Sequence, residues 1–334
     1  MKLIKKIKLM LIILCTVSSV SAQDMHFTQF YASSLYLNPA FSGADVCSRI
    51  TLTYRNQWPG VSKTYRTYLF SADHYFNDKN IGAGILLGSD VAGSGNLKTT
   101  VINVPIAYEA KLTKKLYIRF GAQPGMIIRS IDFNKLMFGD QIARGGDVAS
   151  VEMPTLTKAF FDAGAGVLFY TKKYWGGFSA YHLNRPNQSI LVDSDGKLPI
   201  KFSFHGGAKF VLNPEEVDLE KRKYVSPAFN FRHQNKFDQL DVGLYWSKSV
   251  MNFGLWYRGI PLAKSYAPGY ANNDAIAIIV GIKNDRFNFG YSYDITISRL
   301  VNLSRGAHEI TISYQLCKIK KKKKVRMLTP CPKF

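Results

Sequence analysis

The chain has 334 residues and a formal net charge of +21, with 46% hydrophobic, 13% aromatic and 20% charged side chains. Its 22 Phe and 19 Tyr exclude a wholly disordered chain. Its charged fraction is below the value of about 25% that is usual for a soluble domain. The positive charge is concentrated at the ends: of 44 bases, four lie in residues 2–8 and eight in residues 318–333, which leaves 32 bases against 23 acids between them. We therefore expect no nucleic-acid partner.

Residues 1–22 have the pattern of a secretory signal peptide, with lysines, a short apolar run over 9–17 and small residues at 20–22. The mature chain is expected to begin at Gln23. The apolar run is too short to span a bilayer as a helix, and no later run approaches ~18 residues. A membrane location would therefore require a closed β-barrel.

The segment 23–47 comes before the first expected strand. Its apolar residues Phe27, Phe30 and Tyr31 recur at helical spacing, and Asn38 and Pro39 would end such a helix. Two placements are open at this point. The segment is either an amphipathic helix against the periplasmic mouth of a barrel or a plug that enters the lumen.

Period-two alternation dominates residues 48–317 and predicts an all-β fold of about 14 antiparallel strands, with 12 possible. Residues 287–297 show the pattern most clearly, with aromatic and aliphatic side chains at every second position. Every second connection is short and most of the others are long, except for the ten-residue turn 213–222. This layout favours a transmembrane outer-membrane β-barrel with short turns and both termini in the periplasm. A secreted pair of β-sandwiches is the alternative.

Charged residues on the polar phase of the expected strands would face the lumen. They are Arg55, Arg119, Asp162, Asp294 and Glu309. Such residues could form internal ion pairs that close the lumen, or line a polar channel, and both alternatives require the same phase.

The two ends of the barrel carry further candidates. In a closed barrel the first and last strands are neighbours, and an even strand number makes them antiparallel, so we predict a disulfide between Cys47 and Cys317 at the periplasmic rim. The segment 318–334 is expected to be a basic periplasmic tail. It would contact either anionic headgroups or an acidic periplasmic partner.

Catalytic motifs are not recognisable in the sequence. The six His residues are scattered without metal-ligand spacing, and neither a nucleophile elbow nor a phosphate-binding loop occurs. We expect no enzymatic activity, no metal and no cofactor.

Several motifs resemble the PorP/SprF family of outer-membrane proteins, which is linked to the type IX secretion system and gliding motility in Bacteroidetes. They are the N-terminal pattern 28–43, the stretch Tyr54, Arg55, Asn56, Gln57, Trp58, Pro59 and Gly60, the hairpin 81–93, and the closing segments 290–294 and 308–310. The resemblance covers about residues 29–316. It implies a non-enzymatic barrel that assists the export or surface retention of a large adhesin, by binding the adhesin, its C-terminal sorting domain, the translocon or periplasmic components.

Two interpretations of the 54–60 motif remain open. Pro59 and Gly60 suit a type II turn, and Trp58 suits an aromatic girdle at the lipid boundary. The motif could instead recognise an extracellular partner. From the fold alone, a porin or hydrophobic-solute transporter is the alternative function.

Overall fold

The computed structural model describes residues 24–45, 47–61, 65–93, 95–132, 136, 139–146, 157–190, 195–218, 221–261, 265–267, 270–284, 286–298, 301–316 and 329–331. The expected signal peptide 1–22, the predicted disulfide partner Cys317 and the basic run 318–328 lie outside these residues.

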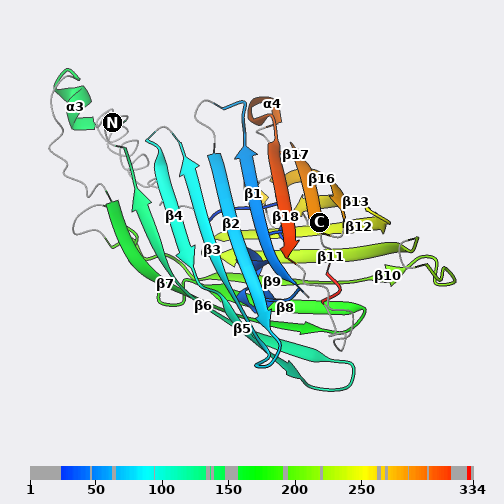
Figure 1. Ribbon diagram of the computed structural model, residues 1–334. Coiled ribbons are helices and arrows are strands. Elements are labelled where there is room, and N and C mark those ends of the chain that lie inside the picture. The colour runs from blue at the N-terminus through cyan, green and yellow to red at the C-terminus, as the bar shows by residue number, and fades with distance from the viewer. Residues whose placement is uncertain are drawn as a thin grey trace.

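A single closed sheet forms the body of the molecule (Figure 1). Its strands are β1 (Ser48–Gln57), β2 (Tyr65–Phe76), β3 (Ile81–Ala92), β4 (Leu97–Asn103), β5 (Ile106–Lys111), β6 (Tyr117–Ser130), β7 (Thr157–Tyr170), β8 (Tyr174–Tyr181), β9 (Lys201–Ala208), β10 (Phe210–Val211), β11 (Lys223–Gln234), β12 (Phe237–Lys248), β13 (Met251–Gly259), β16 (Asn273–Lys283), β17 (Phe287–Thr296) and β18 (Ala307–Leu316). A separate two-stranded ladder joins β14 (Ser265–Ala267) to β15 (Tyr270–Ala271).

The sheet is an antiparallel barrel with 14 wall strands. β4 and β5 are two parts of one strand interrupted at Val104 and Pro105, because proline cannot donate to the ladder. β9 and β10 are likewise two parts of one strand, and both pair with β11. The pairing of β1 with β18 over ten residue pairs closes the ring. The predicted fold class is confirmed.

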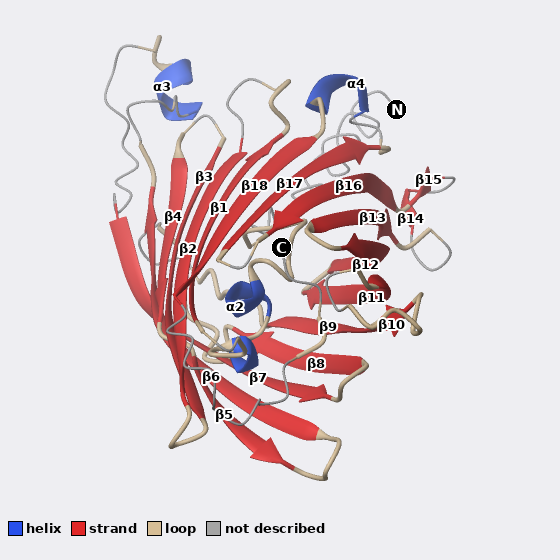
Figure 2. Cartoon of the chain, turned by 45° about the vertical axis from the view of Figure 1, so that its right-hand side comes forward, coloured by secondary structure: helices blue, strands red, loops and turns tan. Residues whose placement is uncertain are grey.

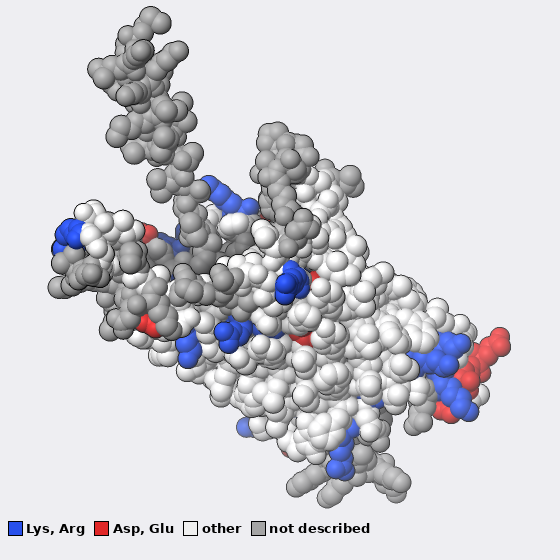
Figure 3. All heavy atoms as spheres, turned by 90° about the horizontal axis from the view of Figure 1, so that it is seen from above, with Lys and Arg blue, Asp and Glu red and all other residues white. Residues whose placement is uncertain are grey.

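Side chains alternate between the two faces of the wall. Along β17, Phe287, Phe289 and Tyr291 are exposed on the outside, whereas Asn288 and Ser292 are buried inside. Much of the surface is accordingly uncharged, with Lys, Arg, Asp and Glu in small groups (Figure 3). This is the pattern of a wall that faces lipid.

The two ends of the barrel differ in their connections. Short turns at one end include 77–80, 112–116, 171–173 and 249–250, and we call this the short-turn end. The opposite, long-loop end carries α3 (Gly139–Ala143) and α4 (Val301–Ser304) (Figure 1). In the described part of the chain, no helix is both long enough and apolar enough to cross a bilayer.

The segment before β1 lies inside the barrel, surrounded by strands (Figure 2). Phe27, Phe30 and Tyr31 are not helical, contrary to their spacing: only α2 (Ser34–Leu37) and the 3-10 turn η1 (Pro39–Phe41) are helical, and residues 24–33 are irregular. As predicted, a helix ends at Asn38 and Pro39, since Asn38 caps α2; Pro39 then begins η1, and the Asn38 side chain accepts a hydrogen bond from the Ala40 amide at 2.9 Å. Wall strands surround the segment, so apolar residues at near-helical spacing reflect burial on several sides rather than one helical face.

The end of the chain returns to the barrel. Thr329 and Cys331 are buried, and Cys331 belongs to a hydrophobic cluster with Tyr31 and Trp175. At least this part of the segment expected to be a basic tail is therefore packed against the protein.

Candidate functional site

The lumen holds the most chemically distinctive part of the molecule, where the segment 24–45 meets the wall. At its centre, the Thr28 hydroxyl donates to Asp294 at 2.7 Å and accepts from Arg55 at 2.8 Å. Arg258 adds a second donor to that oxygen at 3.0 Å. The two oxygens of Glu309 accept the backbone N–H groups of Thr28 and Gln29 at 2.7 and 2.9 Å. One threonine and its neighbour thus bind β1, β13, β17 and β18.

Ion pairs connect the charged wall residues around Thr28. Arg55 contacts Asp294 at 2.8 Å and Glu309 at 3.0 Å, whereas Arg258 contacts Asp294 at 3.0 Å. Asp241 continues the network to Arg258 at 2.7 Å and to Arg232 at 2.8 Å. We call Thr28, Arg55, Arg232, Asp241, Arg258, Asp294 and Glu309 the Thr28 cluster. Its three guanidinium and three carboxylate groups balance, as burial of charge requires.

A second ionic group holds the first described residue at the long-loop end. Asp24 contacts His182 at 2.9 Å and Lys201 at 2.7 Å, and His182 also contacts Asp162 at 2.8 Å. Burial alone would raise the pKa of Asp24, but Lys201 and His182 hold it well below its usual range. Although burial lowers the pKa of His182, the carboxylates of Asp24 and Asp162 raise it to about 9. Both Asp24 and His182 lie outside the strands, and at neutral pH both are charged.

These contacts fix the direction of the segment. His182 follows β8 and Lys201 begins β9, both at the long-loop end, whereas Ser48 begins β1 at the short-turn end. The segment therefore runs through the barrel from the long-loop end to the short-turn end. Asp24 thus lies at the long-loop end, and the periplasmic location of both termini stays a prediction. Period-two patterns determine the direction of strands and not the path of the segment before them.

Glycines in the wall make room for the segment near the short-turn end. A Cβ atom on Gly82, Gly121 or Gly166 would overlap Ser42, Ala40 or Asn38, respectively. The Asn38 amide donates to the carbonyl oxygens of Val167 at 3.0 Å and Phe178 at 3.1 Å. We call Gly82, Gly121 and Gly166 the glycine seat. The backbone of residues 39–42 packs directly on β3 and β6, and the Asn38 and Pro39 side chains pack on β7.

Arg119 fastens the same segment from the side. Its guanidinium donates to the carbonyl oxygens of Ala40, at 2.7 Å, and Ser42. Glu109 neutralises the charge at 2.6 Å and also accepts from the Tyr170 hydroxyl at 2.6 Å. Arg119 and Glu109 lie opposite each other in the β5–β6 register, so the wall itself holds the pair together.

Arg49 fixes the exit of the segment into β1. It contacts Asp45 at 3.2 Å and Asp73 at 3.2 Å, and donates to the Ser34 hydroxyl at 2.8 Å. Asp73 also accepts from the Gly43 amide at 2.8 Å. Gly43 has a φ of 62° and lies close to the backbone of His74 and Gly82, so a larger residue would be strained there.

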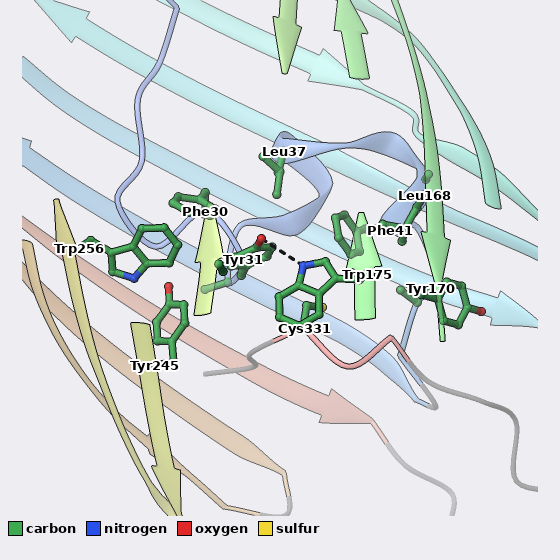
Figure 4. Packing of buried hydrophobic residues seen from close by; sticks show 14 of the residues in the cluster. Phe30, Tyr31, Leu37, Phe41, Leu168, Tyr170, Trp175, Tyr245, Trp256 and Cys331 are labelled. Atoms are coloured by element: carbon green, nitrogen blue, oxygen red, sulfur yellow. Dashed lines mark hydrogen bonds between the residues drawn. The ribbon is translucent and has the colours of Figure 1, made fainter. Parts of the chain in front are cut away.

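Aromatic packing fills the space between the polar contacts (Figure 4). Phe30 meets Trp256 edge-on with ring centroids 4.8 Å apart, and the Trp175 indole donates to the Tyr31 hydroxyl at 3.1 Å. Met25, Phe27 and Leu35 form a second apolar cluster with the inner side of β2–β4 and β6. The segment is thus buried against several sides of the barrel.

The Tyr54–Gly60 motif divides between the lumen and the long-loop end. Arg55 belongs to the Thr28 cluster, and Gln57 accepts from it at 3.4 Å. Trp58 has a φ of 57°, donates its amide to Gly306 at 2.8 Å and packs edge-on with Tyr65. The turn is not type II, because Trp58 rather than Gly60 takes the positive φ. Gly60 lies under α4, where a Cβ would overlap the Leu303 carbonyl.

The five predicted lumen residues are buried but do not form one network. Arg55, Asp294 and Glu309 meet at Thr28, whereas Arg119 and Asp162 lie in separate groups. The sequence interpretation missed their partners, chiefly Glu109, His182, Lys201, Asp241 and Arg258. Most of these partners lie at inward positions of the strands, so the period-two pattern could have identified them. The same pattern could have identified the inward glycines, which indicate a close backbone approach.

The described cysteines differ in state. Cys47 is disulfide-bonded, whereas Cys331 is a thiol buried in the aromatic cluster. Among the residues that the structure describes, no group of three or more His, Cys, Asp or Glu side chains could hold a metal ion.

Comparison with known proteins gives a family and a set of distant folds. Residues 19–314 match the family described as Type IX secretion system membrane protein PorP/SprF. No curated protein matches the chain. Among solved structures, the Pseudomonas putida toluene transporter TodX is 12% identical with a TM-score of 0.46, over 88% of this chain and 95% of that one. The Acinetobacter baumannii outer membrane protein Omp33 is 6% identical with a TM-score of 0.43, over 81% and 99%. Such low values give no basis for transferring an activity.

Replacing Arg55 by Met should destabilise the barrel. The substitution removes the guanidinium bound to Glu309 and leaves Asp294 with Arg258 alone, so we expect the free energy of unfolding to fall by about 3–5 kcal/mol. Urea unfolding in vesicles measures the loss, and hydrogen exchange at the amides of Thr28 and Gln29 should accelerate. Lys248→Met removes an exposed charge and is the control. Equal behaviour of the two variants would contradict the proposed role of the cluster.

Replacing Gly121 by Ala should disturb the glycine seat, because the added Cβ would overlap the Ala40 amide. We expect a loss of about 1–3 kcal/mol in unfolding free energy and faster hydrogen exchange over residues 38–43. Gly176→Ala is a matched control, since the nearest atom to its added Cβ is 3.9 Å away. A tight seat is refuted if Gly121→Ala matches this control in stability and exchange.

Proposed function

Because the chain belongs to the PorP/SprF family of type IX secretion system membrane proteins, we propose that it is a non-enzymatic accessory barrel of that system. It binds a large secreted adhesin through the adhesin's C-terminal sorting domain, or the translocon, and so assists export or surface retention. The observation that carries the proposal is the occupied lumen: the segment 24–45 is buried and bonded to the wall along its length. A barrel filled in this way acts through its surfaces.

The long-loop end offers an apolar surface for such a partner. Val61, Val301 and Leu303 are 41%, 52% and 65% exposed beyond the ends of the wall strands. Gly60 and Trp58 fix this surface, since the Gly60 amide donates to Ser304 at 3.2 Å. Exposed apolar side chains on an ordered element favour protein binding. The 54–60 motif would then contribute to recognition by holding α4 in place.

Replacing Leu303 by Glu should abolish partner binding while leaving the barrel intact. The tagged chain is pulled down from outer membranes and its partners are identified by mass spectrometry. The unchanged chain should recover a large secreted protein or a translocon component, and this variant should recover at least about tenfold less of it. Val217→Glu places the same charge on a side chain 88% exposed in the turn at the opposite end, and should leave recovery unchanged. Recovery of no partner by the unchanged chain would contradict the proposal, and solute-selective conductance in planar bilayers would instead favour a porin or hydrophobic-solute transporter.

We also propose that the long loops are extracellular and the short turns periplasmic, as in outer-membrane barrels generally. Asp24 is held by His182 and Lys201 at the long-loop end, so the chain before it would reach the extracellular mouth. The basic segment 318–328 would remain on the periplasmic side, near headgroups or periplasmic components.

An epitope inserted between Gln23 and Asp24 should therefore be accessible to antibody on intact cells. The same epitope inserted between Glu216 and Val217, in the turn at the short-turn end, should become accessible only after permeabilisation. The reverse pattern of labelling would overturn the orientation.

We further propose that Cys47 pairs with Cys317. Ser48 and Leu316, their neighbours in sequence, face each other in the register of β1 and β18. Peptide mapping without reductant should find a peptide pair linked through Cys47 and Cys317. Recovery of Cys317 as a free thiol would disprove the pairing.

A further inference from the structure

Two cationic side chains stand on the outer face of the wall near the long-loop end. Arg66 on β2 and Lys98 on β4 are exposed, and each lies directly opposite Val91 of the intervening β3. Neither forms an ion pair with any other side chain in the described part of the chain. A base in the hydrocarbon of a bilayer is costly, by roughly 2–4 kcal/mol at the midplane and about 0–1 near the interface. This row of the wall therefore belongs at the level of the lipid headgroups.

An apolar hollow lies directly below the two cations. One row further into the wall, about 7 Å along the strands, Tyr68, Ser89 and Thr100 occupy successive positions in register. The hollow has a volume of 380 Å³. Its lining includes Leu52, Tyr54, Tyr68, Leu87, Ile310 and Ile312.

Small side chains create this hollow between larger ones. Gly88, Ser89 and Thr100 line it together with Tyr54 and Tyr68, whose rings are tilted by 39° with centroids 5.0 Å apart. The rest of the outer wall carries large aliphatic and aromatic residues at most outward positions. The hollow is thus a defined recess in a surface that lipid covers.

We propose that this recess and the two cations form a binding site for one phosphorylated glycolipid of the lipid A type in the outer leaflet. An acyl chain occupies the hollow, and phosphate groups bind Arg66 and Lys98. Two strand spacings, about 10 Å, separate the two cations, which suits a headgroup that carries more than one phosphate. The choice of leaflet rests on the proposed orientation. Binding of the lipid at this site does not depend on which protein partner the barrel has.

Native mass spectrometry of the full chain in detergent, titrated with a diphosphorylated lipid A, tests the proposal. We expect binding of one lipid per chain. The double variant Arg66→Gln with Lys98→Gln should lower affinity by about 30-fold, at about fivefold for each base. Lys114→Gln with Lys115→Gln removes the same charge from exposed positions at the short-turn end and should leave affinity unchanged.

A second variant tests the hollow without altering charge. Ser89→Leu with Thr100→Leu fills the recess and should weaken binding of the same lipid, and dephosphorylated lipid A should bind the unchanged chain as weakly as diphosphorylated lipid A binds the double Gln variant. The site is refuted if the Arg66 and Lys98 variant binds like the Lys114 and Lys115 control, or if the filled hollow binds like the unchanged chain. Recovery of the protein partner in pull-down is a separate readout, so loss of either result does not decide the other.

Discussion

The structure depends on the mutual neutralisation of buried charges around Thr28. Three arginines and three carboxylates from β1, β11, β12, β13, β17 and β18 face the lumen, where the N-terminal segment covers them and excludes water. Without partners, each buried charge would carry a desolvation cost of several kcal/mol. With Thr28 and Gln29 in place, Glu309 accepts two backbone donors while Asp294 is shared by Arg55, Arg258 and the threonine hydroxyl. The segment and the wall therefore specify each other.

Two different chemistries hold the segment at its two ends. Charge and hydrogen bonding predominate near the long-loop end, where Asp24 and Thr28 bind ionic groups of the wall. Close backbone packing predominates near the short-turn end, where the glycine seat admits residues 38–42.

The two faces of the wall have separate roles. In β1, the Arg55 side chain faces the lumen and that of its neighbour Tyr54 faces lipid. The 54–60 motif therefore contributes to the interior, the membrane-facing surface and a loop.

The wall could be predicted from sequence because each strand carries its own two-faced pattern. Phe287, Phe289 and Tyr291 face lipid as their alternation indicates, and the expected range 287–297 agrees closely with β17. The inward charges Asp294 and Glu309 could be recognised for the same reason. Their grouping could not, because which strands meet across a lumen depends on the register and curvature of the whole ring. The spacing of Phe30 and Tyr31 predicted a helix that does not form there, for a related reason. Residues buried among surrounding strands can have the same spacing as one face of a helix.

The direction of the segment has a consequence for assembly. The chain passes along the lumen axis and then turns back at Gly43 to begin β1, so the first strand and the interior lie antiparallel to each other. Thr28 and Gln29 bind β18 through Glu309, while Arg55 binds Thr28 from β1, on the other side of the seam. If the ring of strands closed first, the segment would have to thread through it. If the segment were in place first, the strands would only have to curl around it. The interior segment is thus bound to both of the strands whose pairing closes the ring.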